Sequence, residues 1–239
     1  MNKSYDNSYL KWKSWDEQSQ FGDLSPKLRA YYKAEIKRSC ASLPKSSKVL
    51  EVGFGSGSFL SYAKHKKWDI CGTEANKHLV EAGIRSGFNV ILSENLKPFS
   101  DNIFDLAVAF DVLEHIHKDN LIQFFAEIKR VLKPGGVFIA CFPNGDSPLG
   151  LRHQNGDITH VTAIGSEMAR YLATQSELKI VFLGGQAEPL LVRDPVLFAH
   201  RLLTLPIIKT LNFFTNLLIT PRSWFAFYSS NLTLSLKNK

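Results

Sequence analysis

Cysteine is scarce in this chain of 239 residues, and its three copies, Cys40, Cys71 and Cys141, form no closely spaced pair. Zinc-binding modules and small disulfide-bonded folds need paired or evenly numbered cysteines. The sequence therefore argues against both, and an odd number of scattered thiols is typical of a reduced protein. We expect a cytoplasmic protein that is stabilised by an ordinary apolar core.

The first residues lack the apolar run of a secretory signal peptide, and neither an internal repeat nor a low-complexity tract follows. Hydrophobic residues make up 44% of the chain and charged residues 21%, which suits a globular protein. The net charge of +7 favours anionic partners, such as nucleic acid, a phosphorylated glycan or a membrane surface. Because the basic residues are dispersed and no RNA-binding motif accompanies them, we expect no nucleic-acid partner.

A regular alternation of strand-like and helix-like segments begins at residue 48. Strands are expected at 49–52, 69–73, 89–92, 104–110, 137–142, 178–183 and 231–236, and helices at 59–66, 77–86, 121–131 and 166–174. This alternation is typical of an α/β fold with a doubly wound, seven-stranded, mostly parallel sheet. Ligands of such sheets bind at the carboxyl ends of the strands, near the point where the strand order reverses.

The residues before the first strand form a separate segment. Apolar residues recur every four positions from Leu28 to Cys40, which predicts a helix over 26–42. We therefore divide the chain into an N-terminal helical cap, 1–45, and a sheet domain, 46–239.

Three glycines follow the first expected strand in the string Val49-Leu50-Glu51-Val52-Gly53-Phe54-Gly55-Ser56-Gly57. Between a strand and a helix, glycine adopts turn conformations that are costly for other residues and leaves the backbone open to a ligand. Glu74 ends the next strand, where a carboxylate can accept hydrogen bonds from both hydroxyls of a ribose. These residues predict a nucleotide-type ligand. These residues alone do not exclude a nicotinamide cofactor, although the GxGxxG spacing usual in nicotinamide-binding folds is absent.

The loop and the segments after it resemble class I S-adenosylmethionine-dependent methyltransferases. Residues 104–115, FDLAVAFDVLEH, look like the fourth strand of that family and its exit, and residues 131–136, VLKPGG, look like the turn before the fifth strand. The resemblance implies a Rossmann-like methyltransferase fold and S-adenosylmethionine as cofactor. The cofactor-binding residues that it implies are Glu51, Gly53, Phe54, Gly55, Gly57, Glu74, Ser93, Glu94 and Asp111.

Two of these implied roles are more specific. Glu51 would orient the glycine loop and the amine of the ligand. Ser93 and Glu94 would lie near the adenine, where this sequence departs from the family's usual acid–small residue pair.

A general base is expected in the loop after the fifth strand, 143–164. A sulfonium methyl group is already electrophilic, so the enzyme mainly has to align the acceptor, and a hydroxyl acceptor also benefits from a base. His160 is the expected base and Asp157, three residues earlier, its helper. His153 is a further candidate in the same loop. Alternatively, these side chains only cap the next helix.

Asp111, Glu114 and His115 form a second polar cluster, and they would share one face if a helix began there. The matching stretch of ubiquinone-pathway O-methyltransferases is similar, and that resemblance implies a divalent metal. Asp111 replaces the glutamate usual in that family, so we expect no metal here. Asp111 would then lie near the amino-acid end of the cofactor.

An insertion of about forty-five residues, 184–228, separates the last two expected strands. Because strand 178–183 should run parallel to its neighbours, the insertion would start at the cofactor edge of the sheet and roof the acceptor site. Its apolar part, 202–220, predicts an amphipathic helix, and Pro206 and a polar stripe argue against a membrane span. The polar stripe is Lys209, Asn212 and Asn216. This helix either contacts a membrane surface or lipid-like substrate, or caps the core of the domain.

The layout also resembles bacterial methyltransferases of surface-polysaccharide pathways, through the Asp-x-Thr-His loop at 157–160 and the apolar insertion. This resemblance implies O-methylation of a sugar hydroxyl in cell-surface glycan biosynthesis, on a nucleotide-linked or lipid-linked acceptor at the inner face of the membrane. A quinone-like or other small phenol is the alternative acceptor. A non-catalytic module that binds the cofactor or a membrane partner is a further alternative.

Overall fold

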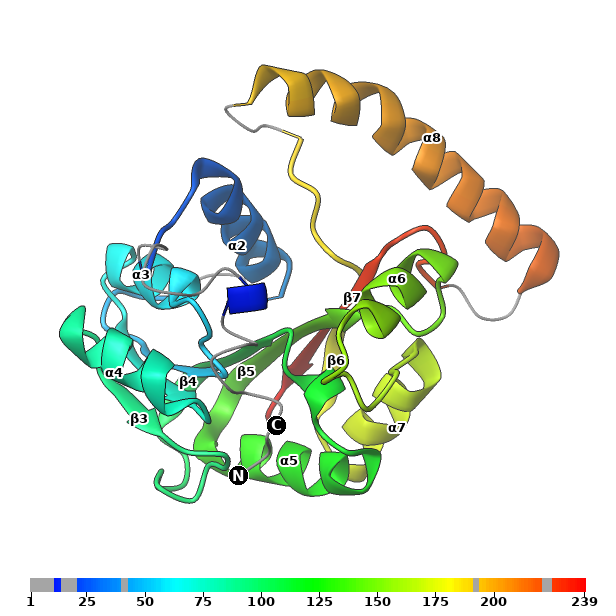
Figure 1. The fold of residues 1–239 in the computed structure, drawn as a ribbon. Helices are drawn as coiled ribbons and strands as arrows, with labels where there is room; N and C mark the ends of the chain where they lie inside the picture. Colours follow the sequence, from blue (N-terminus) through cyan, green and yellow to red (C-terminus); the bar gives the residue numbers. More distant parts are fainter. Residues whose placement is uncertain (1–10, 14–20, 40–42, 191–193, 221–224) are drawn as a thin grey trace.

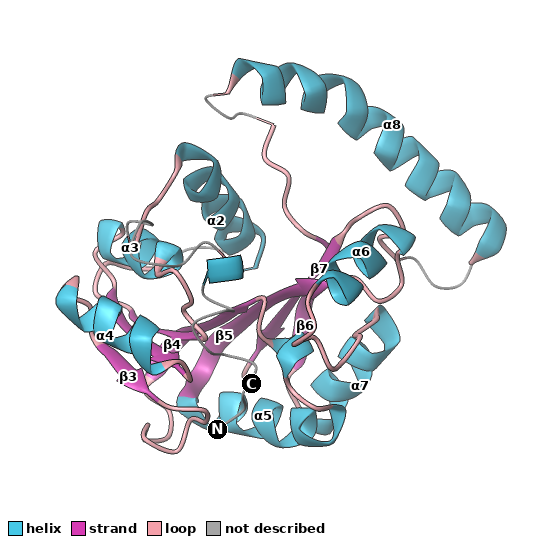
Figure 2. Ribbon diagram, in the orientation of Figure 1, coloured by secondary structure: helices cyan, strands magenta, loops and turns pink. Residues whose placement is uncertain are grey.

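The computed structural model describes residues 11–13, 21–39, 43–190, 194–220 and 225–239. They contain a seven-stranded sheet with the order β3-β2-β1-β4-β5-β7-β6 (Figures 1 and 2). The strands are β1 Lys48–Val52, β2 Asp69–Glu74, β3 Val90–Leu92, β4 Phe104–Phe110, β5 Leu132–Pro143, β6 Lys179–Gly185 and β7 Asn231–Lys237. Strands β1 to β5 pair in parallel, and β7 pairs antiparallel with β5 and β6. The expectation that strand 178–183 runs parallel to its neighbours is wrong, because β6 pairs with β7, although β6 keeps the direction of β1 to β5. The predicted doubly wound, mostly parallel sheet is confirmed.

Helices cover both faces of the sheet. On one face lie α2 Pro26–Ser39, α3 Ser58–His65 and α4 Lys77–Arg85, and on the other α5 Lys118–Val131 and α7 Ser166–Gln175. The apolar run of the central strand β4 is continuous because both of its faces are covered by helices. Leu106 and Val108 pack with the first set of helices, whereas Ala107 and Ala109 pack with the second. The strand order reverses between β1 and β4, which places the ligand cleft at their carboxyl ends.

Two connections differ from the prediction. The segment 143–164, expected as a loop, contains helix α6, Pro148–Gly156. Ser147 begins it, because its side chain accepts a hydrogen bond from the amide of Leu149 and a proline follows in the first turn. This Ser-Pro start was visible in the sequence, but the helix is too short to show a clear apolar period.

The predicted turn at 131–136 is also different. Strand β5 begins at Leu132, before the glycines, and its pairing shifts from Phe104–Leu132 to Leu106–Val137. Gly135, with φ of 81°, lies in this irregularity, so the turn is a bulge inside the strand. After β4, a short 3-10 turn, η2 Leu113–His115, replaces the helix considered for the polar cluster.

A buried acid, Glu35, joins helix α2 to strand β7 and to the connection that follows β6. Glu35 has no exposed surface, and it accepts hydrogen bonds from the backbone amide of Ala187 at 2.6 Å and from Oγ1 of Thr233 at 3.0 Å. Arg38 donates to the same carboxylate from Nε, at 2.7 Å. The last residues of the predicted helix, 40–42, lie outside the described residues.

The insertion contains one long helix, α8, Pro195–Ile219, which begins before the predicted 202. Asp194 caps its start, accepting hydrogen bonds from the amides of Val196 and Leu197. Figure 1 shows α8 standing apart from the sheet and its covering helices. Within α8 only Asn216 is buried, so the interpretation of this helix as a cap on the core is wrong.

Candidate active site

The glycine loop connects β1 to α3 at the point where the strand order reverses. Gly53, Gly55 and Gly57 have φ values of 65°, 50° and 77°, in the left-handed region that disfavours other residues. A Cβ on Gly53 would lie 2.7 Å from Cγ2 of Val112. The amide of Gly53 donates to the carbonyl of Thr73 at 2.8 Å, which holds the loop against β2.

Glu74 ends β2 as predicted and lies beside this loop. Its Oε2 accepts a hydrogen bond from the amide of Gly55 at 3.1 Å, and its Oε1 accepts from Ala75 at 2.8 Å and Asn76 at 3.1 Å. Burial raises the pKa of Glu74, while these three amide hydrogen bonds oppose the shift. Carboxylate oxygens have further lone pairs, so the predicted bonds to ribose hydroxyls remain compatible with these contacts.

Glu51 is buried at the base of the loop, only 4% exposed. Among the described residues, no hydrogen-bond donor reaches its Oε2. Burial and the nearby charge of Glu74 raise the pKa of Glu51, and the amide of Leu60 opposes them. A buried carboxylate oxygen without a donor is costly. An amine of a bound ligand would satisfy it, as the predicted role of Glu51 requires.

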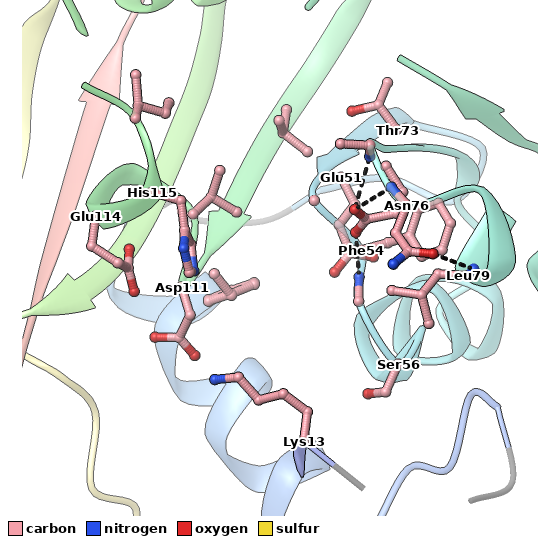
Figure 3. Close-up of a pocket in the computed structure, with 18 of the residues that line it drawn as sticks. Lys13, Glu51, Phe54, Ser56, Thr73, Asn76, Leu79, Asp111, Glu114 and His115 are labelled. Carbon is pink, nitrogen blue, oxygen red and sulfur yellow. Dashed lines mark hydrogen bonds between the residues drawn. The ribbon is translucent and has the colours of Figure 1, made fainter. Parts of the chain in front are cut away.

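These residues line a cavity of about 1070 Å³ at the carboxyl edge of the sheet. Figure 3 shows the group around Glu51 and Asn76 facing the group of Asp111 and His115, with Lys13 reaching from the N-terminal segment. Every predicted cofactor residue except Gly57 lines the cavity. The ring of Phe54 is buried against Phe21 at a centroid distance of 6.0 Å.

Ser93 and Glu94 line the same cavity after β3. The amide of Ser93 donates to the carbonyl of Glu74 at 2.9 Å, so the two strand ends are adjacent. At the exit of β4, Asp111 has a φ of 54° and its amide donates to the carbonyl of Cys141 at 2.8 Å. This backbone aims the Asp111 carboxylate into the cavity, toward Lys13 (Figure 3).

The predicted base, His160, lies at the other end of the cavity among ionisable side chains. Its Nε2 is 3.6 Å from Oδ2 of Asp157 and 3.8 Å from Oε1 of Glu114, and its ring meets that of His115 edge-on at 4.7 Å between centroids. Burial lowers the pKa of His160, and Lys13 adds to this effect, while Asp157 opposes it. A lowered pKa favours the neutral imidazole, which is the form that a general base needs.

Asp157 is bound more closely by residues other than His160. Its Oδ2 lies 2.8 Å from Nζ of Lys13, and its Oδ1 accepts hydrogen bonds from the amide and hydroxyl of Thr159. Burial raises the pKa of Asp157, but the contacts with Lys13 and Thr159 together hold it well below its usual range. Its separation from His160 exceeds a hydrogen bond, so Asp157 acts on that ring as a nearby negative charge. The helper role remains a prediction.

Glu114 is a buried acid, with a side chain only 1% exposed. Neither of its carboxylate oxygens has a hydrogen-bond partner among the described residues. Burial and the charge of Asp111 raise its pKa well above the usual value. Its Oε1 lies 3.8 Å from Nε2 of His160, too far for a direct hydrogen bond.

A metal could be considered at the same place, because Glu114, His115 and His160 offer ligand atoms within 4.8 Å of one another. Nδ1 of His115 lies 3.0 Å from Oγ1 and 3.2 Å from the carbonyl oxygen of Thr159, so only its Nε2 is left for a cation. Burial lowers the pKa of His115 to about 4. A metal-free site remains our prediction.

The sequence did not single out Trp12, Lys13 or Arg152, which line the cavity. Trp12 and Lys13 belong to a segment without apolar periodicity, so nothing marked them as part of the sheet edge. Arg152 lies on α6, the helix that the prediction missed. His153, a predicted candidate, lines the cavity beside it.

Comparison with known proteins finds similarity to methyltransferases both in sequence and in fold. Residues 50–140 match a family model described as a methyltransferase domain. A crystal structure of a SAM dependent methyltransferase from Archaeoglobus fulgidus has the same fold, with a TM-score of 0.66, 17% sequence identity, and coverage of 97% of this chain and 100% of that one. Residues 50–140 thus resemble a methyltransferase domain, and the chain has the fold of S-adenosylmethionine-dependent methyltransferases.

Two curated relatives match a shorter part of this chain, at higher sequence identity. The chain is 34% identical over 103 residues to 24-methylenesterol C-methyltransferase 3 of Arabidopsis thaliana, covering 39% of this chain and 28% of that protein. It is 34% identical over 126 residues to uncharacterized protein MJ1123 of Methanocaldococcus jannaschii, covering 52% of this chain and 57% of that protein. The chain thus spans between about a quarter and three fifths of the length of these relatives.

Proposed function

We propose that this protein transfers the methyl group of S-adenosylmethionine to a hydroxyl of a sugar, with His160 accepting the hydroxyl proton. The observation on which this rests is the group of charged and polar side chains that lines the cavity together with His160, beside apolar ones such as Trp12 and Phe124. This group comprises Lys13, Asp111, Glu114, His115, Arg152, His153, Asp157, His160 and Asn231.

A polyhydroxylated acceptor suits such a lining. Each sugar hydroxyl both donates and accepts hydrogen bonds, and carboxylates, imidazoles and an amide supply partners for both. A sterol or a quinone-like phenol would fit the apolar part of the lining but leave most of these polar groups without partners, which is costly. Lys13 and Arg152 add positive charge, which favours an acceptor that carries a phosphate.

The chemistry needs few groups. Bound S-adenosylmethionine supplies a methyl group on a positively charged sulfur. Glu51 and the glycine loop hold its amino-acid end, and Glu74 its ribose. Neutral His160 takes the proton from the acceptor hydroxyl as the new O–CH₃ bond forms and the S–CH₃ bond of the cofactor breaks, which releases S-adenosylhomocysteine. The Asp157 carboxylate, 3.6 Å from Nε2, stabilises the resulting imidazolium.

The direct test is a screen with a radiolabelled methyl donor. Nucleotide-linked sugars, lipid-linked sugars and quinone precursors are offered separately, and the product is analysed for an O-methyl group. Transfer to a sugar supports the proposal. Transfer only to a phenol, or to carbon or nitrogen, contradicts it. Calorimetry with S-adenosylhomocysteine distinguishes an enzyme that lacks its acceptor from a protein that does not bind the cofactor.

A further inference from the structure

The outward side of helix α8 is a broad apolar surface. Leu203, Ile207, Phe214 and Leu218 are 70%, 59%, 51% and 78% exposed, and their spacing places them on one side of the helix. Leu202, Leu211, Phe213 and Leu217 widen this surface and are all at least 46% exposed. We call these eight residues the α8 apolar face. A soluble monomer rarely exposes so large a continuous apolar patch.

The polar side chains of α8 point the other way, toward the chain's own connections. Asn216, which is 1% exposed, donates from Nδ2 to the carbonyl of Phe225 at 2.9 Å and accepts the amide of Phe225 through Oδ1 at 2.9 Å. Thr215 lies 3.1 Å from the hydroxyl of Tyr228, and Arg201 donates to the carbonyl of Pro189. Asn212 and Asn216 of the predicted polar stripe therefore face the protein, whereas Lys209 is exposed, and α8 turns its apolar side outward. This is the reverse of a helix that covers a core.

By length and composition, α8 is able to cross a membrane: its apolar window has a mean hydropathy of 1.5. Soluble core helices also reach such values, but they are buried, whereas only 6% of this window is buried. Signal sequences reach them too, but they lie near the N-terminus, whereas α8 lies between β6 and β7. Neither ordinary explanation applies to this helix.

The connections of α8 favour a helix that lies flat over one that crosses. Strands β6 and β7 are antiparallel neighbours with Gly185 opposite Leu232, so the chain leaves and re-enters the sheet at one edge. If α8 crossed a bilayer, the chain would have to return through it to reach β7, and residues 225–230, which form neither helix nor strand, would lie in hydrocarbon, which does not tolerate irregular backbone. The bonds between Asn216 and Phe225 also hold the returning chain alongside the helix.

We infer that the α8 apolar face docks on the surface of a lipid bilayer with anionic headgroups, with the helix axis parallel to the membrane plane. Three observations select this partner: the face is apolar, the returning chain prevents crossing, and the net charge is +7. Lys209, exposed at the edge of the face, is placed to reach headgroup phosphates.

Docking in this orientation also bears on the proposed methyl transfer, although it does not depend on it. Asn231, the first residue of β7, lines the catalytic cavity and directly follows the connection from α8. A membrane at α8 therefore lies on the side of the molecule where the cavity edge of the sheet opens. An acceptor on a lipid carrier would meet the site there.

The test is co-sedimentation of the full chain with vesicles of phosphatidylcholine that contain about a third of phosphatidylglycerol. The variant Leu203→Asp/Ile207→Asp/Leu218→Asp should lower the bound fraction about tenfold or more. Its matched control is Ile84→Asp, because Ile84 is as exposed as Ile207, 59%, but lies on α4. The control should sediment with vesicles as the unchanged protein does.

Folding is checked separately, by circular dichroism and by binding of S-adenosylhomocysteine, both of which the α8 variant should retain. If the unchanged protein stays in the supernatant, or the variant sediments as strongly, the inference is overturned. Retention in the membrane after an alkaline carbonate wash would show a spanning helix instead. A lipid-free dimer that the α8 substitutions dissociate would show that a second copy covers this face.

Discussion

The ammonium of Lys13 lies 2.8 Å from Oδ2 of Asp157, and this contact joins the N-terminal segment to the connection between β5 and α7. Asp157 is 3% exposed at its side chain, while Lys13 is 28% exposed, so the pair lies where the buried cluster meets the open cavity. The positive charge lowers the pKa of both Asp157 and His160. Lys13 is thus placed to tune the group that we propose as the base.

Replacing Lys13 with Met should move the pH dependence of methyl transfer to higher pH. Without the ammonium, the pKa of His160 rises, so a larger fraction of His160 is protonated near neutral pH and cannot accept a proton. The measurement is kcat/KM against pH. Lys13→Arg keeps the charge and should keep the profile; an unshifted profile for Lys13→Met would remove Lys13 from this role.

The unchanged protein should lose activity as the pH falls through the pKa of His160, which burial lowers below its ordinary value of 6.5. Above that pKa the imidazole is neutral and accepts the proton; below it the imidazole is charged and cannot. His160→Ala should lower kcat roughly 10²-fold and remove this acidic limb. His65→Ala, on α3, is the matched control. A His160→Ala variant with a normal rate and normal cofactor affinity would contradict the role.

Gly53→Ala should weaken binding of S-adenosylhomocysteine by about tenfold or more. The new methyl group would lie 2.7 Å from Val112, at a φ of 65° that alanine adopts only with strain, so the loop must shift. Gly87→Ala separates strain from crowding, since Gly87 has a φ of 74° with nothing within 4 Å. Calorimetry should show normal binding for Gly87→Ala. Equal losses in both variants would indicate general destabilisation.

The cofactor half of the site was predictable from the sequence because its signals are local. Gly53 directly follows β1 and Glu74 is the last residue of β2, and a parallel sheet brings such residues to one edge whatever the rest of the chain does. Lys13 reaches the site only through tertiary packing of the N-terminal segment, for which no periodicity exists. The outward orientation of α8 depends on contacts such as that of Asn216 with Phe225, and a helical pattern alone cannot say which side faces the protein.

Removing divalent cations should leave the transfer rate unchanged. Lys13 already supplies a positive charge next to Asp157, and Thr159 occupies Nδ1 of His115, so the cluster has only part of a cation's ligands. The assay is repeated after treatment with EDTA and dialysis. Loss of activity that Mg²⁺ or Zn²⁺ restores would instead assign Glu114, His115 and His160 to a metal, as their spacing permits.

Glu35→Ala should lower the free energy of unfolding by about 3–5 kcal/mol, because the mostly buried side chain of Arg38 loses the carboxylate with which it pairs. Glu35 has no exposed surface and bonds to Arg38, the amide of Ala187 and the hydroxyl of Thr233, so three separate segments lose a shared partner. Urea denaturation measures the change.

The control is Glu81→Ala, which removes an exposed ion pair with Lys77 at 3.8 Å and should cost less than about 1 kcal/mol. Because Ala187 begins the connection from β6 toward α8, Glu35→Ala should also loosen the hold on that connection, seen as faster amide exchange at residue 187. If both variants lose the same small amount, the Glu35 cluster is not what joins α2 to the sheet.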